Sequence, residues 1–240
     1  MSIPNGLIHP PQRSFKPRRR GLSPERTVAY ERAMARWGIA VDGEELSFDE
    51  VLAGTGSQCN GIVLDIGFGG GDALIELAET RPSETVLGVD VHTPGLAAVL
   101  EAIKIRGLRN VRVIDGDVIE FLPRIPPRSL DTIRVFFPDP WPKQRQRVRR
   151  LIRPDVVRRL VERLSVGGTL HLVTDDADYA VQMQLVCDAD AGLVGGVIER
   201  PTWRPVTRFE QRGIEEGRPP VDLVYIASDS SASDSSSALR

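Results

Sequence analysis

The sequence has few residues of the kinds that bind metals or form disulfides. Its 240 residues include two cysteines and three histidines. Cys59 and Cys187 lie far apart and match no metal-ligand spacing, and the histidines are scattered at positions 9, 92 and 171. We therefore expect neither a disulfide framework nor a zinc site, and no other metal cofactor.

Long apolar segments are also lacking. No apolar run approaches the roughly 18 residues that a membrane span requires. The first twenty residues carry basic side chains with no apolar stretch after them, which argues against a secretory signal. We therefore expect a cytoplasmic protein that does not associate with membranes. The length predicts one large domain with extensions, because a domain averages about 150 residues.

The net charge of −2 hides two strongly basic segments. Residues 1–26 contain six basic residues and one acidic residue, and residues 140–159 contain eight basic residues and one acidic residue. Charge segregated in this way indicates a polyanionic partner, and nucleic acid is the first candidate. A solvated basic loop and a basic tail without a partner are the alternative that composition alone leaves open.

The ends of the chain differ in composition from the middle. Residues 1–21 mix proline with arginine and lack apolar periodicity, which predicts a disordered basic extension. Residues 228–240 are rich in serine and aspartate and predict a disordered tail. Residues 22–60 form the N-terminal helix and connector: the helix begins after Ser23 as N-cap and ends at Gly38, and an irregular connector follows.

The main domain is expected over residues 61–227. Short apolar strands alternate there with helices, which is typical of a mostly parallel α/β sheet with crossover connections. The expected strands are 61–66, 85–91, 111–114, 131–137, 169–174, 194–199 and 221–227. The expected helices are 72–80, 94–106, 155–164 and 177–189. The last two strands, joined by a long loop without a clear helix, are expected to pair antiparallel.

Acidic residues follow the expected strands at their carboxyl ends, where open α/β sheets bind their ligands. The five acids are Asp65, Asp90, Asp117, Asp139 and Asp175. Asp65 opens a turn with the sequence DIGFGGG, whose glycines let a ligand approach the backbone. Asp90 is placed to hydrogen-bond the hydroxyls of a ribose. A nucleoside cofactor is therefore expected in this crevice.

The glycine turn favours S-adenosylmethionine over a dinucleotide. A dinucleotide turn needs a small residue at its sixth position, and this chain has Asp72 there. The Asp65 carboxylate would also repel a pyrophosphate, whereas it would attract the sulfonium and ammonium groups of S-adenosylmethionine. A nucleotide-linked oxidoreductase is therefore the less favoured reading.

The segment FFPDPWPK (residues 136–143) and its basic continuation QRQRVRRLIRP closely resemble the bacterial tRNA (guanine-N7)-methyltransferases. The resemblance covers residues 61–227, with further landmarks in DIGFGGG, GVDVH, NVRVIDGD, GGTLHLVTD and RPVTRFEQRG. It implies a seven-stranded Rossmann-like sheet with helices on both faces, the class I methyltransferase fold. It also implies S-adenosylmethionine as methyl donor and tRNA as partner, with methyl transfer to N7 of a guanosine in the tRNA variable loop.

The resemblance also implies roles for individual residues. The positions that match cofactor-binding residues of the family are Asp65, Gly67, Asp90, Asp117 and Asp139. Asp139 also matches the residue assigned as catalytic. The positions that match substrate-binding residues are Lys143, Asp175, Thr207, Arg208, Phe209 and Glu210. No obligate protein partner is expected.

The chain departs from the family pattern at three of these places. The family more often has glutamate where this chain has Asp65 and Asp90, a shortening that should preserve cofactor binding. After Asp175 the family usually has tryptophan, and this chain has Asp176, which puts a stacking role at that position in doubt.

Two alternative functions that are compatible with the same motifs stay open. A methyltransferase acting on an exocyclic amine of RNA or DNA uses a similar loop, but this chain lacks a second proline directly after Pro140. An inactive methyltransferase-like RNA-binding protein is disfavoured because Asp139 and Lys143 are retained. The arginines of residues 145–153 are expected to hold tRNA phosphates. Trp141 either packs between its neighbouring prolines or flanks the target base.

Overall fold

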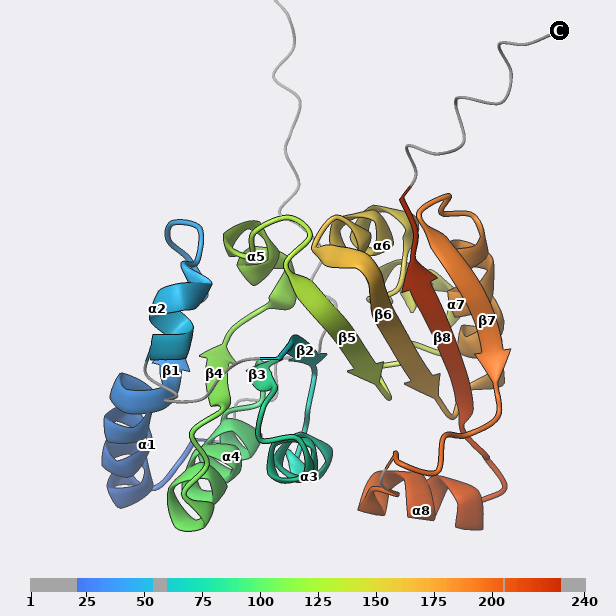
Figure 1. Ribbon diagram of the computed structural model, residues 1–240. Helices are drawn as coiled ribbons and strands as arrows, with labels where there is room; N and C mark the ends of the chain where they lie inside the picture. The colour runs from blue at the N-terminus through green and yellow to red at the C-terminus, as the bar shows by residue number, and fades with distance from the viewer. Residues whose placement is uncertain (1–20, 54–59, 205, 230–240) are drawn as a thin grey trace, which may run out of the picture.

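The computed structural model describes residues 21–53, 60–204 and 206–229. Of the segments expected to be disordered, residues 1–21 and 228–240, these ranges include only residues 21, 228 and 229, and the Ser228 amide there donates to the Gly192 carbonyl at 2.8 Å. Within them, eight strands form one sheet with helices on both faces (Figure 1). The strands are β1 (Gly38–Ile39), β2 (Ile62–Ile66), β3 (Thr85–Asp90), β4 (Val111–Asp115), β5 (Leu130–Phe136), β6 (Leu164–Thr174), β7 (Leu193–Ile198) and β8 (Val221–Ala227).

The helices that connect these strands agree largely with the sequence prediction. The α-helices are α1 (Pro24–Trp37), α2 (Phe48–Ala53), α3 (Asp72–Thr80), α4 (Thr93–Arg106), α5 (Val118–Phe121), α6 (Pro154–Val161), α7 (Ala177–Asp188) and α8 (Arg208–Glu215). Two 3₁₀ helices are η1 (Leu122–Arg124) and η2 (Gln144–Arg149). The start of α1 is as predicted: the Ser23 side chain accepts a hydrogen bond from the Arg26 amide at 3.4 Å, and Pro24 takes the first helical position.

The order of the strands places a switch point in the middle of the sheet. The order is β1-β4-β3-β2-β5-β6-β8-β7, and the pairs from β1 to β6 are parallel. The chain builds outward from β2 to β4 and then returns to add β5 on the other side of β2. Ligands bind at such a reversal because the crossover connections on its two sides leave a crevice there.

The predicted antiparallel pairing of the last two strands is confirmed, since β8 runs antiparallel to both β6 and β7. The predicted α/β class is confirmed, and three details differ. The connector that was expected to be irregular contains the helix α2. The sheet has eight strands rather than seven, because Gly38 and Ile39 in the expected connector pair with β4 at the sheet edge. The loop between β7 and β8 contains the helix α8, although no helix was expected there.

Two hydrophobic layers hold the sheet. Leucine, isoleucine and valine side chains of α3 and α4 pack on one face of β2, β3 and β4, with α1 against them. The helices α5, α6 and α7 pack on the other face, which continues across β5, β6 and β8. All residues of β2 and β3 are buried, as expected of parallel strands covered on both sides. These central strands form a rigid base for the loops at their ends.

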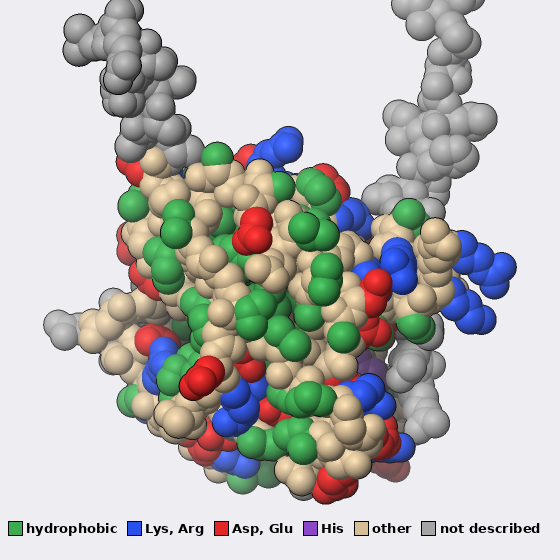
Figure 2. Space-filling view, turned by 90° about the vertical axis from the view of Figure 1, so that its right-hand side faces the viewer, with side chains coloured by type: hydrophobic (Ala, Val, Ile, Leu, Met, Phe, Trp, Pro, Cys, Tyr) green, Lys and Arg blue, Asp and Glu red, His purple; other side chains and the backbone are tan. Residues whose placement is uncertain are grey.

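The edge of the sheet that carries β7 presents apolar side chains to solvent. Hydrophobic side chains gather on this side of the molecule (Figure 2). Val194 and Val197 of β7, with Val181 and Leu185 of α7, are each more than half exposed. Among the described residues, no helix combines the length and the apolar character that crossing a bilayer would need.

Candidate functional site

The arrows of β5 and β6 point toward α8 in Figure 1, and the parallel pairing of β1 to β6 brings the carboxyl ends of these strands to the same edge of the sheet. The five strand-end acids are therefore brought to one edge, as predicted. Asp65 is the next-to-last residue of β2, Asp90 is the last residue of β3, and Asp117 follows β4. Asp139 and Asp175 follow β5 and β6. The edge includes the switch point between β2 and β5, which makes it the candidate active site.

The glycine turn after β2 requires its glycines. Gly67, Gly69 and Gly71 have φ angles of 73°, 56° and 84°, in the left-handed region that other residues rarely adopt. A Cβ at Gly71 would lie 2.0 Å from Cγ2 of Val99 in α4. At Gly67 and Gly69, by contrast, nothing lies within 4 Å of the Cβ position. The turn thus packs on α4 at one end and leaves open backbone for a ligand at the other.

Asp90 holds the glycine turn in place. One oxygen of its carboxylate accepts a hydrogen bond from the Gly69 amide at 2.7 Å, and the other accepts from the His92 amide at 2.8 Å. Burial raises the pKa of Asp90, and these backbone hydrogen bonds oppose the rise. Each carboxylate oxygen can accept a second hydrogen bond, so the ribose contact predicted for Asp90 remains chemically possible.

Asp65 lies beneath the same turn and is buried beside Arg134 of β5. The two residues face each other in the register of β2 and β5, with 3.8 Å between an Arg134 Nη and an Asp65 Oδ. Burial raises the pKa of Asp65, while the Arg134 guanidinium acts against this rise. Arg134 also lies over the ring of Phe136, 4.5 Å from its centroid. Sequence reasoning missed Arg134, since a lone arginine in an apolar strand gives no signal.

The remaining acids on the cofactor side also have structural roles. Asp117 is the N-cap of α5 and accepts a hydrogen bond from the Ile119 amide at 2.9 Å. The neighbouring Asp115 accepts a hydrogen bond from the Tyr30 hydroxyl at 2.7 Å, which fastens α1 to this edge. Burial and the nearby carboxylate raise the pKa of Tyr30 above its ordinary value.

These features fit a cationic nucleoside cofactor. Acid groups lie under and beside a glycine turn that has open backbone, and Asp72 stands exposed at the start of α3. The donor set therefore agrees with the expectation of S-adenosylmethionine.

Asp139 lies in a strained loop after β5 and its side chain is exposed. Phe137 and Trp141 on either side of it have φ angles of 52° and 45°, which are unfavourable for bulky aromatic residues. Such strain is found at functional sites where the surrounding structure enforces it. Trp141 is only 2% exposed and has the Arg149 guanidinium 5.0 Å from its ring centroid. Trp141 therefore packs inside the loop rather than flanking a base.

The basic loop behaves differently from the prediction at one position. Lys143, Arg145, Arg147 and Arg149 are exposed on η2 and its cap, where they can meet an anion. Arg150 is 1% exposed, and its guanidinium donates to the Pro140 carbonyl, the Gln182 amide oxygen and the Asp178 carboxylate at 2.6–2.7 Å. The expectation that every arginine of the loop holds a phosphate is therefore wrong for Arg150, which anchors the loop to α7.

The expected substrate-binding residues lie on both sides of the β6 end. Asp175 follows β6 and pairs with Arg218 at 3.0 Å, beside the C-terminal turn of α8. Thr207 is the N-cap of α8 and accepts a hydrogen bond from the Glu210 amide at 3.2 Å. The side chains of Arg208 and Phe209 fall outside what the structure describes. Asp176, which replaces the family's tryptophan, caps α7 by accepting from the Tyr179 amide at 2.8 Å.

Glu210 has a setting that the sequence did not reveal. Its carboxylate is buried and paired with two arginines, Arg200 and Arg204. Arg204 continues to the buried Asp222 of β8, which in turn contacts His171 of β6 at 2.8 Å. Sequence analysis singled out neither Arg204 nor Asp222. The RP-x-x-R-F-E spacing could have indicated the Arg204–Glu210 pair. The six positions from Arg204 to Glu210 cover a chain turn and the first turn of a helix, which brings the two side chains together.

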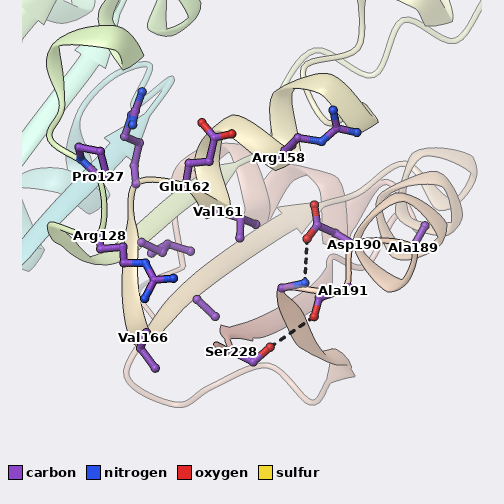
Figure 3. A pocket seen from close by; sticks show the side chains of 14 residues that line it. Pro127, Arg128, Arg158, Val161, Glu162, Val166, Ala189, Asp190, Ala191 and Ser228 are labelled. Carbon is purple, nitrogen blue, oxygen red and sulfur yellow. Dashed lines mark hydrogen bonds between the residues drawn. The ribbon is translucent and has the colours of Figure 1, made fainter. Parts of the chain in front are cut away.

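A separate surface hollow lies away from these residues. It has a volume of about 580 Å³ and lies at the amino ends of β5 and β6, where Arg128, Arg158 and Val166 line it (Figure 3). Asp190 and Ser228 there form local hydrogen bonds with Gly192 and the Ala191 carbonyl. This hollow is at the opposite edge of the sheet from the strand-end acids, so it is not the candidate active site.

Comparison with known proteins shows to which family the chain is related. A family model described as "Putative methyltransferase" matches residues 60–223. The tRNA (guanine-N(7)-)-methyltransferase of Streptomyces avermitilis is 41% identical over 219 residues, which cover 89% of this chain and 74% of that protein. The proteins of the same name from Xanthomonas oryzae pv. oryzae and Nitrosomonas eutropha are 42% and 37% identical, with 85% and 97% of their lengths covered.

Solved structures show the same fold at lower identity. The 16S rRNA (adenine(1408)-N(1))-methyltransferase W203A mutant from Catenulisporales acidiphilia matches with a TM-score of 0.52 at 18% identity, over 77% of this chain and 92% of that one. The antibiotic-resistance methyltransferase Kmr matches with a TM-score of 0.51 at 19% identity, over 76% and 92%. The sheet is that of a Rossmann-like methyltransferase, and the chain belongs to the tRNA (guanine-N7)-methyltransferase family.

Proposed function

We propose that this chain transfers the methyl group of S-adenosylmethionine to N7 of a guanosine in the variable loop of tRNA. The observation that carries the proposal is the exposed Asp139 in its strained loop, at the switch-point edge of a chain about 40% identical to enzymes named for this reaction. A tRNA substrate also implies that the activity takes place in the cytoplasm.

The residues expected to hold the cofactor are those around the glycine turn. Asp65 supplies negative charge near the methionyl end, Gly67 gives open backbone, and Asp90 and Asp117 offer oxygens to the nucleoside. When bound, S-adenosylmethionine supplies an electrophilic methyl group on a sulfonium centre. No metal has a part in this proposal.

The chemistry of guanine N7 determines which kind of catalysis the protein must provide. It is an sp² nitrogen with a free lone pair and no proton to lose, so a general base at N7 is unnecessary. The bond from N7 to the methyl carbon forms as the bond from sulfur to that carbon breaks, and the guanine ring becomes positively charged. The protein therefore accelerates the reaction mainly by alignment and by electrostatic stabilisation.

Asp139 is suited to stabilise that positive charge. As the methyl group arrives, N1–H and the exocyclic amine of guanine become stronger hydrogen-bond donors. An Asp139 carboxylate that accepts from them binds the transition state more tightly than the ground state, which is the requirement for catalysis. The exposed side chain of Asp139 makes no ion pair within the part of the chain that the structure describes, so it is free to do this.

The remaining expected contacts belong to the tRNA. Lys143 and the exposed arginines of η2 are placed to bind phosphates. Asp175, at the end of β6, and the Thr207–Glu210 segment are proposed to border the target nucleotide.

Mass spectrometry of nucleosides tests the proposal. Unmodified tRNA is incubated with the protein and S-adenosylmethionine, digested, and compared with a digest from a reaction without cofactor. We expect 7-methylguanosine in the complete reaction alone. A methylated exocyclic amine would instead assign the protein to the amine methyltransferases, and binding of tRNA without any methylation would identify an inactive RNA-binding protein.

A further inference from the structure

Five charged or ionisable side chains form a closed network between α8, β6 and β8. Arg204 donates to both oxygens of Glu210, at 2.6 and 2.8 Å, and lies 2.9 and 3.0 Å from the two oxygens of Asp222. Arg200 pairs with Glu210 at 3.0 Å, and His171 Nε2 lies 2.8 Å from Asp222. We call these residues the Arg204 network.

The burial of this network is unusual for so many charges. Arg204, Glu210, Asp222 and His171 are each 2% exposed or less. Removing ions from water is costly, and mutual attraction repays the cost only when the geometry is good and the hydrogen bonds are complete. Here two arginines balance two carboxylates, and every carboxylate oxygen has a partner. Nε of Arg204 lies 2.9 Å from Asp222 as an ion pair without hydrogen-bond geometry. The planar fork of Arg204 orients both carboxylates at once, which a lysine ammonium cannot do.

The position of the network suggests more than stability. The ring of His171 meets the ring of Phe136 edge-on, with 4.8 Å between centroids, and the Arg204 guanidinium is 5.8 Å from the same Phe136 ring. Phe136 is the last residue of β5 and leads directly into the loop of Asp139. On the other side, Glu210 belongs to the first turn of α8, directly after its N-cap Thr207. The network therefore joins the two segments that border the proposed target nucleotide.

We propose that Arg204, Asp222 and His171 are positioning residues for the methyl transfer. They fix the Thr207–Glu210 segment relative to the Asp139 loop without touching the reacting atoms. This inference rests on the proposed function. A displacement of about 1 Å between groups that align a reaction can cost about 10²-fold in rate. Loss of the fork should therefore slow the chemical step far more than it weakens tRNA binding.

The test compares Arg204→Lys and Asp222→Asn with a matched control at Arg212, on the adjoining helix α8. Arg204→Lys keeps the charge and removes the fork. Arg212→Lys makes the same change in an exposed ion pair with Glu216, where the arginine side chain is 78% exposed. Each variant is assayed below its own melting temperature for single-turnover methylation at saturating cofactor and tRNA, and for tRNA affinity.

We expect Arg204→Lys and Asp222→Asn each to lower the single-turnover rate by about 10- to 100-fold, with tRNA affinity within about threefold of wild type. The double variant should be about as slow as the slower single variant, because residues that act as one unit are not additive. Arg212→Lys should match wild type in both measurements.

Wild-type single-turnover rates in folded Arg204→Lys and Asp222→Asn proteins would overturn the inference. So would variants that lose structure at every temperature, since the network would then serve stability alone. Failure of the wild-type protein itself to methylate tRNA would be distinguishable, because it would refute the proposed function rather than the role of these residues.

Discussion

At the scale of single residues, Asp139 differs from the other acids at the carboxyl ends of the strands because it has no structural role in the described part of the fold. Asp65 pairs with Arg134, Asp90 holds the glycine turn and Asp117 caps a helix, whereas the Asp139 side chain is exposed. An acid without a structural task can be replaced without disturbing the fold. Its contribution to catalysis can therefore be measured cleanly.

We expect Asp139→Ala to retain cofactor and tRNA binding and to lose about 10²-fold or more in single-turnover methylation, the scale of a lost oriented electrostatic contact. Asp139→Asn should be nearly as slow, because an amide carries no charge and offers a weaker acceptor. An alanine variant that turns over at the wild-type rate would make Asp139 a structural loop residue.

Asp65 should make the affinity for S-adenosylmethionine depend on pH, and the raised pKa of Asp65 fixes the direction of that dependence. Burial raises its pKa, so the ionised form is lost at a higher pH than for an ordinary aspartate. Because only the ionised carboxylate attracts a cationic cofactor, affinity for S-adenosylmethionine should fall as pH drops through that raised pKa. We expect calorimetry to show binding that weakens as the pH is lowered from neutral. Asp65→Asn should reduce the difference, and the part that remains is expected from Asp90, whose pKa burial also raises. An unchanged pH dependence would assign all of it to groups other than Asp65.

At the scale of elements, the buried Arg150 anchors the η2 loop to α7. Arg150 binds the Pro140 carbonyl and two side chains of α7, and it lies over the ring of Tyr179. Hydrogen bonds from a charged donor contribute about 1.5–3 kcal/mol. We expect Arg150→Ala to lower the free energy of unfolding by about 3 kcal/mol in urea melts. Arg149→Ala, which removes an exposed arginine, should change it by less than about 0.5 kcal/mol. Equal effects would mean that Arg150 does not anchor the loop.

The elements that could be predicted are those whose apolar pattern decides them. The strands around β2 and β3 and the helices α3 and α4 were predicted closely, since buried parallel strands and their crossover helices leave a regular pattern. The 3₁₀ helix η2 and the two-residue strand β1 leave none. The structural role of Arg150 could not be predicted, because a basic run does not reveal which of its arginines faces inward.

The helix α8 was not predicted, although its sequence contains a signal for a helix start. That segment was interpreted only as a substrate-binding motif. Thr207 and Glu210 have the spacing of a capping box, in which a threonine caps a helix and a glutamate follows three residues later. The structure shows the threonine half of that arrangement, while the glutamate turns inward to Arg204. Reading these residues only as a substrate-binding motif concealed their local role. The acids at the strand ends were easier to place, because topology alone brings strand ends together.

At the scale of the whole molecule, basic charge is concentrated beside the candidate site. Lys143 and the exposed arginines of η2 follow the Asp139 loop directly, whereas Arg128 and Arg158 line the hollow at the opposite edge of the sheet. Phosphate contacts release counterions, so each one contributes to the slope of log affinity against log salt.

We expect the double variant Arg145→Ala/Arg149→Ala to reduce the magnitude of this slope for tRNA by roughly one to two units and to leave cofactor affinity unchanged. The control Arg128→Ala/Arg158→Ala removes the same charge from the opposite edge and should leave the slope as it is. Equal reductions by both pairs would show that net charge, rather than the position of the loop, governs tRNA binding.

The central claim is that the methyl group goes to N7 of guanine in tRNA, and substitution of that atom tests it most directly. A tRNA transcript in which 7-deazaguanine replaces guanine keeps N1–H and the exocyclic amine but has no lone pair at position 7. Methyl incorporation from labelled S-adenosylmethionine is measured for this transcript and for its unsubstituted counterpart. The account predicts incorporation into the unsubstituted tRNA, recovered as 7-methylguanosine, and none into the 7-deaza tRNA. Methylation of the 7-deaza tRNA, or no methylation of the unsubstituted one, would contradict it.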